Sequence, residues 1–159
     1  AVEGAAEVGA GQVIDGRNEI APVEGVEEVG AELEEALLAP SDLADAPILP
    51  DTAVDYGAVI PFKQRMLRRA FARFQQGFAD HLRPDFEAFC ETQASWLNDY
   101  ALFAALKSAN GGGSWSSWDA GLRSRDPAAL DAARRTYADE IAYQCFIQYL
   151  FFDQWLALK

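Results

Sequence analysis

The stretch ASWLNDYALFAALKSANGGGSWSSW, residues 94–118, decides how this chain folds. Between Trp96 and Leu106 its large apolar residues recur every three or four positions, which is the spacing of residues along a helix. Three consecutive glycines then interrupt the pattern, and two tryptophans follow them. The stretch therefore predicts a helix over residues 96–109 and a short aromatic loop after it.

Local signals mark both ends of this expected helix. The side chain of Ser95 can cap the first turn, and Asp99 complements the helix dipole near the N-terminus. At the other end, Asn110 precedes glycines that readily adopt the left-handed conformation with which many helices end. Trp115 and Trp118 then lie in the glycine-flanked loop.

Downstream, a second start signal opens the last part of the chain. Asp126 caps a helix that Pro127 begins, since proline fits the first helical position. No glycine or proline occurs from there to Leu158, which allows one continuous helix about 48 Å long at 1.5 Å per residue. Its second half, residues 141–158, is apolar on nearly every side. Such a helix must be covered all round.

We expect that covering to come from outside this sequence, because the other expected helices are too few and too short. It would be either further chain or a partner protein. Phe151 and Trp155, near the end of the apolar half, are the candidate partner-binding residues on this helix.

Upstream, an amphipathic helix is predicted over Phe62–Phe78, and a shorter one over Arg83–Gln93, where Pro84 takes the first turn. One side of the first helix is apolar and is formed by Leu67, Phe71, Phe74 and Phe78. The other side carries a basic stripe of Arg65, Arg69 and Arg73 at four-residue spacing. This stripe either faces solvent or holds an anionic partner, including the chain's own acidic segment.

The acidic segment is residues 1–51, which hold thirteen acidic residues against one basic residue and contain no aromatic residue. Residues 52–159 hold all nineteen aromatic residues and carry no net charge. We therefore expect an irregular arm over 1–51, extended or disordered unless bound, and a helical domain over 52–159. Within the arm, Glu24–Leu38 has helical spacing, and Pro40, Pro47 and Pro50 predict an extended connector.

Several classes of function are disfavoured by composition. A formal net charge of −12 repels nucleic acid, and no apolar run approaches the roughly 18 residues of a membrane span. Cys90 and Cys145 have no metal or redox spacing and are expected to be buried thiols, although a single disulfide stays open. No metal or other cofactor is expected. The fold class predicted is all-α, with about four or five helices, one of them long.

Motifs in this sequence match a known family in their order and spacing. They are Val54-Asp55-Tyr56 with Lys63, residues 95–103, Ala105-Leu106-Lys107, Trp115 with Trp118, Leu122-Arg123, and residues 148–155. Together they resemble the amylomaltase or disproportionating-enzyme family of 4-alpha-glucanotransferases, over about Asp51–Lys159. In that family this region looks like a helical subdomain inserted into a TIM barrel, followed by a helix that leads back into the barrel.

The resemblance implies retaining transfer of alpha-1,4-glucan segments between maltooligosaccharides, without a cofactor. That chemistry uses an aspartate nucleophile and a glutamate acid/base with carboxyl groups about 5–5.5 Å apart. In the family these acids lie on later barrel strands, so we expect no catalytic residue here. A barrel also takes roughly 200 residues or more, so we expect this chain alone to lack one. The local acids Asp99, Asp119, Asp139 and Glu140 have ordinary interpretations as caps or surface charges.

Glucan binding is the function that the aromatic residues themselves could carry. A glucose ring has an apolar face that stacks on aromatic rings, and Tyr100 resembles a tyrosine of the family's glucan-contacting groove. Trp115 and Trp118 are of a suitable type for the same contact. The alternative is that all three are core residues, since large amphipathic rings at helical spacing are commonly buried.

Three hypotheses follow from the sequence. The chain is part of a glucanotransferase whose barrel lies elsewhere, or a non-catalytic subunit of a larger assembly, or a glucan-binding module. Its expected partners are the missing barrel portion or other protein subunits, and a maltooligosaccharide. By family resemblance its expected location is the bacterial cytoplasm or the plastid stroma.

Overall fold

The computed structural model describes residues 37–48 and 52–158. Within these ranges the chain forms helices and no strand, which confirms the predicted all-α fold. The α-helices are α2 (Tyr56–Gln75), α3 (Arg83–Thr92), α4 (Ala94–Ala109), α5 (Ala120–Arg123), α6 (Pro127–Thr136) and α7 (Ala138–Ala157). Short 3-10 helices are η1 (Pro40–Leu43), η2 (Asp80–Leu82) and η3 (Trp115–Ser117).

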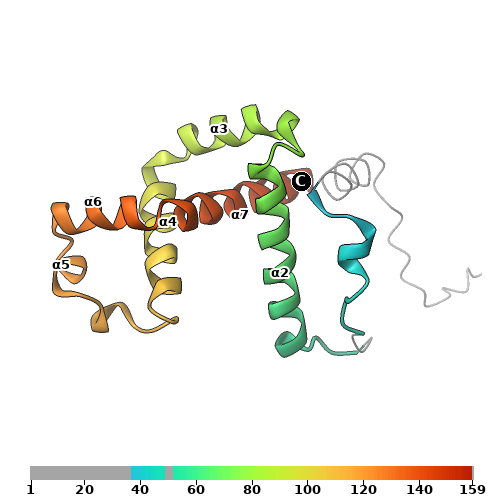
Figure 1. The fold of residues 1–159 in the computed structure, drawn as a ribbon, viewed down its shortest axis with the longest axis horizontal. Helices are drawn as coiled ribbons and strands as arrows, with labels where there is room; N and C mark the ends of the chain where they lie inside the picture. The colour runs from blue at the N-terminus through green and yellow to red at the C-terminus, as the bar shows by residue number, and fades with distance from the viewer. Residues whose placement is uncertain (1–36, 49–51, 159) are drawn as a thin grey trace, which may run out of the picture.

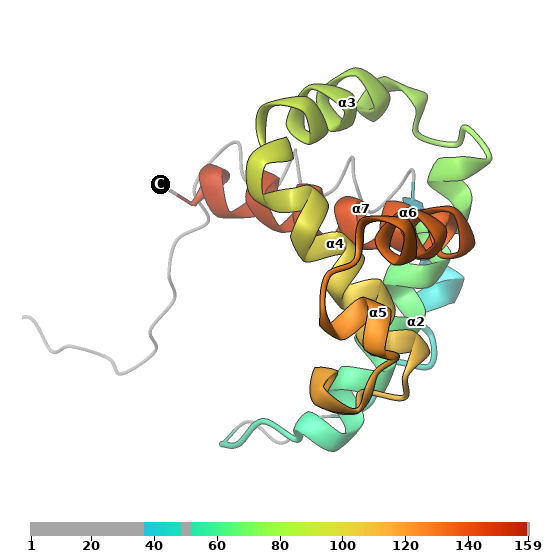
Figure 2. The ribbon, with the colours of Figure 1, turned by 90° about the vertical axis from the view of Figure 1, so that its left-hand side faces the viewer.

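Helix α7 is the centre of the arrangement, because α2, α3, α4 and α6 all pack against it. Figure 1 shows α2 and α4 crossing α7 at two separate places, with α3 bridging them along one edge. The side view in Figure 2 places α5 and α6 next to α4, at the end of the molecule away from the C-terminus of α7. The fold therefore has two ends that share one long helix.

The core at the α2 end consists mainly of aromatic rings. Phe146 of α7 is fully buried, and its ring centroid lies 4.9 Å from that of Phe74 and 5.4 Å from that of Phe71. The guanidinium of Arg68 covers the ring of Tyr143 at 3.5 Å. Aromatic side chains bury large areas and pack in tilted or offset pairs, so this cluster fixes α2 on α7.

Helix α2 begins and ends differently from the prediction over Phe62–Phe78. It begins at Tyr56, where the carboxylate of Asp55 accepts a hydrogen bond from the Ala58 amide. It ends at Gln75, because Gly77 has a φ of 85° and its amide and the next one bond back to the last turn. Phe78 consequently lies outside the helix and is 63% exposed, so its predicted place on the apolar face was wrong.

Helix α4 ends as predicted, with Asn110 at the C-cap and Gly111 and Gly112 at positive φ. Its start differs. The helix begins at Ala94, directly after α3, and Ser95 lies inside it and is not the cap. The helical spacing in the sequence continues across this junction, which is why local signals misplaced the start.

The last helix is divided into two. Asp126 caps α6 by accepting a hydrogen bond from the Ala129 amide, as predicted. At Tyr137 the backbone leaves the helical conformation, with φ −109° and ψ 25°, so the expected continuous helix is wrong. The break lets α6 pack on α4 and α5 while α7 packs on α2 and α3. Together with the four-residue helix α5, it raises the number of helices above the expected four or five.

Part of the acidic segment lies on α2. The predicted helix Glu24–Leu38 falls outside the described residues except for its last two, of which Leu37 is buried in the α2 core. Pro40 begins η1, so the connector is not extended throughout. The carboxylate of Asp42 forms ion pairs with Arg69 at 2.9 Å and Arg73 at 2.7 Å.

These two ion pairs account for two arginines of the basic stripe. The third, Arg65, has its guanidinium 5.7 Å from the ring of Phe62. The binding of a separate partner protein by this stripe stays a prediction.

Candidate functional site

The predicted ligand-contacting residue Tyr100 lies on α4 at its contact with α7. Its side chain is exposed to 40%, and its ring centroid lies 6.0 Å from that of Trp96. The hydroxyl of Tyr100 accepts a hydrogen bond of 3.2 Å from the side-chain amide of Gln148. The ring is therefore held in place and keeps an accessible face.

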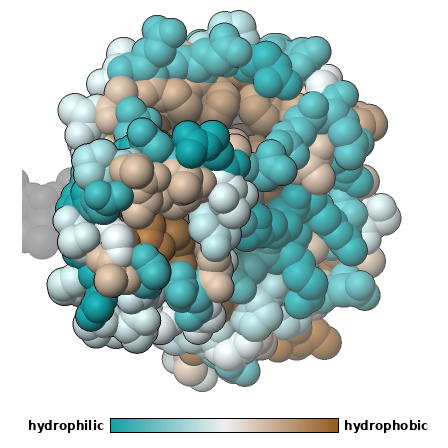
Figure 3. Space-filling model, turned by 60° about the vertical axis from the view of Figure 1, so that its left-hand side comes forward, coloured by the Kyte–Doolittle hydropathy of each residue, from teal (hydrophilic) through white to brown (hydrophobic). Residues whose placement is uncertain are grey.

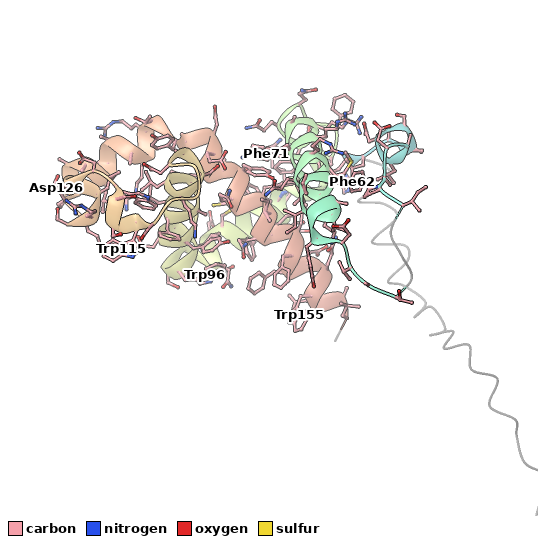
Figure 4. The ribbon with its side chains drawn as sticks, turned by 90° about the horizontal axis from the view of Figure 1, so that it is seen from below. Phe62, Phe71, Trp96, Trp115, Asp126 and Trp155 are labelled. Carbon is pink, nitrogen blue, oxygen red and sulfur yellow. The ribbon has the colours of Figure 1, made fainter. Side chains whose placement is uncertain are left out.

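Further rings continue from Tyr100 across to α7, and of these Trp96 of α4 and Phe152 of α7 are half-buried. The ring of Trp96 contacts that of Phe152 at 5.7 Å, Phe152 contacts Phe151 at 5.7 Å, and Phe151 stacks on Trp155 at 6.2 Å. We call these five residues the aromatic row. Phe151 and Trp155, the predicted partner-binding residues, are about half exposed. Figure 4 shows Trp96 and Trp155 on the same side of the molecule.

The other two predicted residues lie apart from Tyr100, in a pocket of about 380 Å³ that we call the α5 pocket. Leucines of α4, α5 and α6 form its floor: Leu102, Leu106, Leu122 and Leu130. Its aromatic walls are Phe103, Trp115 and Trp118. Figure 3, turned so that the α5 and α6 end comes forward, shows hydrophobic residues at the bottom of a hollow among hydrophilic ones.

The two tryptophans of the α5 pocket differ in exposure. Trp115 is 58% exposed and lines the pocket, whereas Trp118 is only 8% exposed and its ring centroid lies 5.5 Å from that of Phe103. The indole Nε1 of Trp118 is buried and has no hydrogen-bond partner among the described residues. Trp118 is therefore a core residue, as in the alternative given for these aromatic residues, whereas Trp115 is not.

Charged groups form the rim of the α5 pocket. Arg125 donates a hydrogen bond of 2.8 Å to the carboxylate of Asp99, and both side chains are more than half exposed. Arg125 has a φ of 56°, the one positive value for a non-glycine residue within 37–48 and 52–158. Non-glycine residues in this region carry strain that surrounding structure must hold. Arg123 completes the rim.

A comparison with known proteins shows which family the chain belongs to. The family model for 4-alpha-glucanotransferase matches residues 18–159. The chain belongs to the 4-alpha-glucanotransferase family. The match begins within the acidic segment, and so it extends further toward the N-terminus than the motifs recognised in the sequence.

Individual 4-alpha-glucanotransferases are similar over most of this chain. The one from Thermus thermophilus is 45% identical over 113 residues, covering 71% of this chain and 23% of that protein. The one from Synechocystis sp. is 39% identical over 126 residues, covering 79% and 25%. The chloroplastic/amyloplastic one from Solanum tuberosum is 29% identical over 113 residues, covering 70% and 19%. The chain thus spans about a fifth to a quarter of the length of these relatives.

The acids considered as local substitutes for a glucanotransferase's catalytic pair mostly have structural partners. Asp99 pairs with Arg125, and Asp119 caps α5 by accepting from the Gly121 amide. Glu140 pairs with Arg68 at 2.7 Å. Burial raises the pKa of Glu140, but the hydrogen bonds from Arg68 and Gln144 outweigh it and the pKa is lowered. A general acid needs a raised pKa, so Glu140 does not fit that role.

Sequence reasoning missed some of the site's polar groups. Asp99 was interpreted as a helix-dipole residue, and Arg125, 26 residues away, had no local signal that could pair it with Asp99. Asp153 lies on α7 beside Phe152 and does not line the α5 pocket; burial, and then the nearby carboxylate of Asp85, raise its pKa. The periodicity of the apolar residues gave no sign of a charged rim around a pocket.

Among residues 37–48 and 52–158, no group of three or more His, Cys, Asp or Glu side chains is placed to hold a metal ion. No helix in the described part of the chain is long and apolar enough to span a membrane.

Proposed function

We propose that this chain is the helical portion of a 4-alpha-glucanotransferase and that Tyr100 contacts a bound alpha-1,4-glucan. The family match over residues 18–159 carries the first part of this proposal. The chemistry would be transfer of alpha-1,4-glucan segments between maltooligosaccharides, with the two catalytic carboxyl groups supplied by a barrel outside these residues.

The surroundings of Tyr100 support glucan contact. Its ring has an accessible face, and the bond from Gln148 fixes the orientation of the ring before a ligand arrives. A preoriented aromatic ring loses little conformational entropy on binding, which favours affinity. Trp96, beside it, is half-buried, and its accessible part would extend the surface on which a second glucose ring can stack.

A chimeric enzyme tests this proposal. In the Thermus thermophilus relative, the 113-residue matching segment is replaced by the corresponding residues of this chain, and glucose release from maltotriose is measured. We expect transfer within tenfold of the parent, and a further loss of at least tenfold with Tyr100→Ala. Phe78→Ala, at an exposed ring outside the aromatic row, is the matched control and leaves the rate unchanged.

Two outcomes would count against it. A chimera that folds with the parent's helical content but transfers nothing would show that this chain is not an equivalent helical portion. Glucose release from maltotriose by the isolated chain would show that its own carboxyl groups are catalytic. Both measurements are independent of where the glucan binds.

A second proposal concerns the end of α7. Phe151, Trp155, Leu156 and Leu158 are 53%, 49%, 62% and 72% exposed. Fully burying an exposed leucine or phenylalanine side chain gives roughly 1.5–3 kcal/mol, and these partly exposed side chains would each gain a part of that, so this end is suited to packing on protein. We propose that it packs on the remaining part of the glucanotransferase polypeptide, because the chain spans only a quarter of its relatives.

Hydrogen exchange distinguishes this from the alternative of a non-catalytic subunit in a larger assembly. Amides of residues 148–158 should exchange at least tenfold more slowly in the chimera than in the isolated chain. Equal exchange would contradict docking on the same polypeptide and leave a separate subunit as the partner. Given the chloroplastic/amyloplastic relative, the proposed location is the bacterial cytoplasm or the plastid stroma.

A further inference from the structure

The α5 pocket has the composition of a neutral sugar site. Its leucine floor and aromatic walls suit the C–H face of a hexose, and its rim supplies carboxylate acceptors and guanidinium donors for hydroxyl groups. Its volume of about 380 Å³ falls within the range of roughly 300–1,000 Å³ typical of small-ligand pockets. An apolar pocket with a few convergent polar groups is the usual form of such a site.

The charged groups at the rim are available for binding. Asp99 and Arg125 are 56% and 64% exposed although they contact each other. Each carboxylate oxygen can accept further hydrogen bonds, and a guanidinium has five N–H donors. Adjacent sugar hydroxyls can therefore bond to the pair without breaking it.

One further polar atom belongs to a residue that lines the pocket. Trp118 Nε1 is a buried donor without a partner among the described residues. Leaving a buried donor unsatisfied in this way is costly. A ligand hydroxyl that reaches the indole would remove this cost, and to do so the side chains that cover the atom must move aside.

We propose that the α5 pocket binds one or two glucosyl units of an alpha-1,4-glucan, at a place separate from Tyr100. Tyr100 is not among the residues that line the pocket, and its hydroxyl faces Gln148 of α7. Asp99 precedes it on α4 and belongs to the pocket rim. The choice of a glucan among neutral sugars rests on the proposed function; the existence of the site rests on the pocket itself.

The position of the pocket suggests how it would serve a long glucan. Figure 4 places Trp115 on the same side of the molecule as Trp96 and Trp155. A glucan that contacts Tyr100 and Trp96 could therefore extend toward the pocket. The pocket would then hold the chain away from the reaction and raise affinity for longer substrates.

The four tryptophans of the chain are built-in reporters for a test. The full chain is labelled with 5-fluorotryptophan, each 19F resonance is assigned with single Trp→Phe variants, and maltotriose is titrated in. The proposal predicts saturable shifts of the Trp115 and Trp118 resonances. Trp115→Ala and Asp99→Asn should each raise the Kd at least tenfold, and Phe78→Ala, an exposed ring outside the pocket, should leave it unchanged.

Trp115 is mostly exposed, so its removal should not unfold the chain, and circular dichroism checks this. If only the Trp96 resonance shifts, or if none does, the proposal that the α5 pocket binds a glucan is wrong. That result would not affect transfer by the chimera. Equal shifts with the beta-linked disaccharide cellobiose would overturn the alpha-glucan assignment. A chimera inactive on maltotriose, with Trp115 still shifting, would overturn the proposed function and retain the site.

Discussion

Asp42 Oδ2 lies 2.7 Å from Nη1 of Arg73, and this contact joins the acidic segment to helix α2. The backbone amide of Ala39 donates to the same carboxylate oxygen at 2.8 Å. This hydrogen bond, together with the charges of Arg73 and Arg69, lowers the pKa of Asp42, although burial acts in the opposite direction. The geometry thus links the attachment of residues 37–48 to the ionisation of one carboxyl group.

Acid should therefore release this segment. A carboxyl group with a lowered pKa in the folded state adds stability above its unfolded pKa of about 3.9, and that stability is lost as pH falls through the folded value. We expect the protection of amides of residues 37–48, measured against the unfolded exchange rate at the same pH, to fall below about pH 4. Asp42→Asn should show the same loss of protection at pH 7, and the exposed Asp45→Asn should not. Unchanged exchange in Asp42→Asn would contradict this role.

Phe146 should be the most costly aromatic residue to truncate. It is fully buried among Phe71, Phe74 and Phe86. Removing a buried phenylalanine side chain costs about 3–5 kcal/mol through lost transfer energy and the cavity left behind. Urea unfolding should show this loss for Phe146→Ala. Phe151→Ala, on the same helix but 53% exposed, should cost less than about 1 kcal/mol, and equal losses would be evidence against the described core.

Features of the fold with a local cause could be predicted from the sequence. Asp126 and Pro127 start α6, and Asn110 with its glycines ends α4, because caps act within a few residues of the chain. The break at Tyr137 could not be predicted, since it contains neither glycine nor proline. It follows from tertiary packing, in which Tyr137 contacts the cluster formed by α4 and α6.

The candidate site likewise combines features that the sequence could predict with features that depend on tertiary packing. The types of its aromatic residues pointed to sugar binding, but their separation into the aromatic row and the α5 pocket depends on how α4 and α7 pack. The pair Asp99 and Arg125 joins positions 26 residues apart. Spacing rules cover three or four residues, so such a pair is found only once the fold is known.

Gly121 should be required for the α5 pocket. A Cβ added to Gly121 would lie 2.9 Å from Cβ of Ala129, closer than such atoms approach in practice. Gly121→Ala should therefore push α5 from α6 and destabilise the chain by about 1–3 kcal/mol, the usual cost of overpacking. In an Ala129→Gly background the same change should cost at least about 1 kcal/mol less. A double-mutant cycle by urea unfolding measures this coupling, and additive losses would show that the two residues are not in contact.

Cys145 should be nearly unreactive in the folded chain. It lies where α7 packs against α3 and α4, beside Cys90. Burial, and then the neighbouring Cys90, raise its pKa to about 11. The thiolate is the reactive form of cysteine, so at pH 8 only about one thousandth of the Cys145 thiols would be ionised.

In Cys90→Ser, which leaves Cys145 as the remaining thiol, reaction with an aromatic disulfide reagent should be at least 100-fold slower in buffer than in urea. Cys145→Ser provides the matched measurement for half-buried Cys90. Comparable rates for Cys145 in buffer and in urea would mean that α3 does not stay packed on α7.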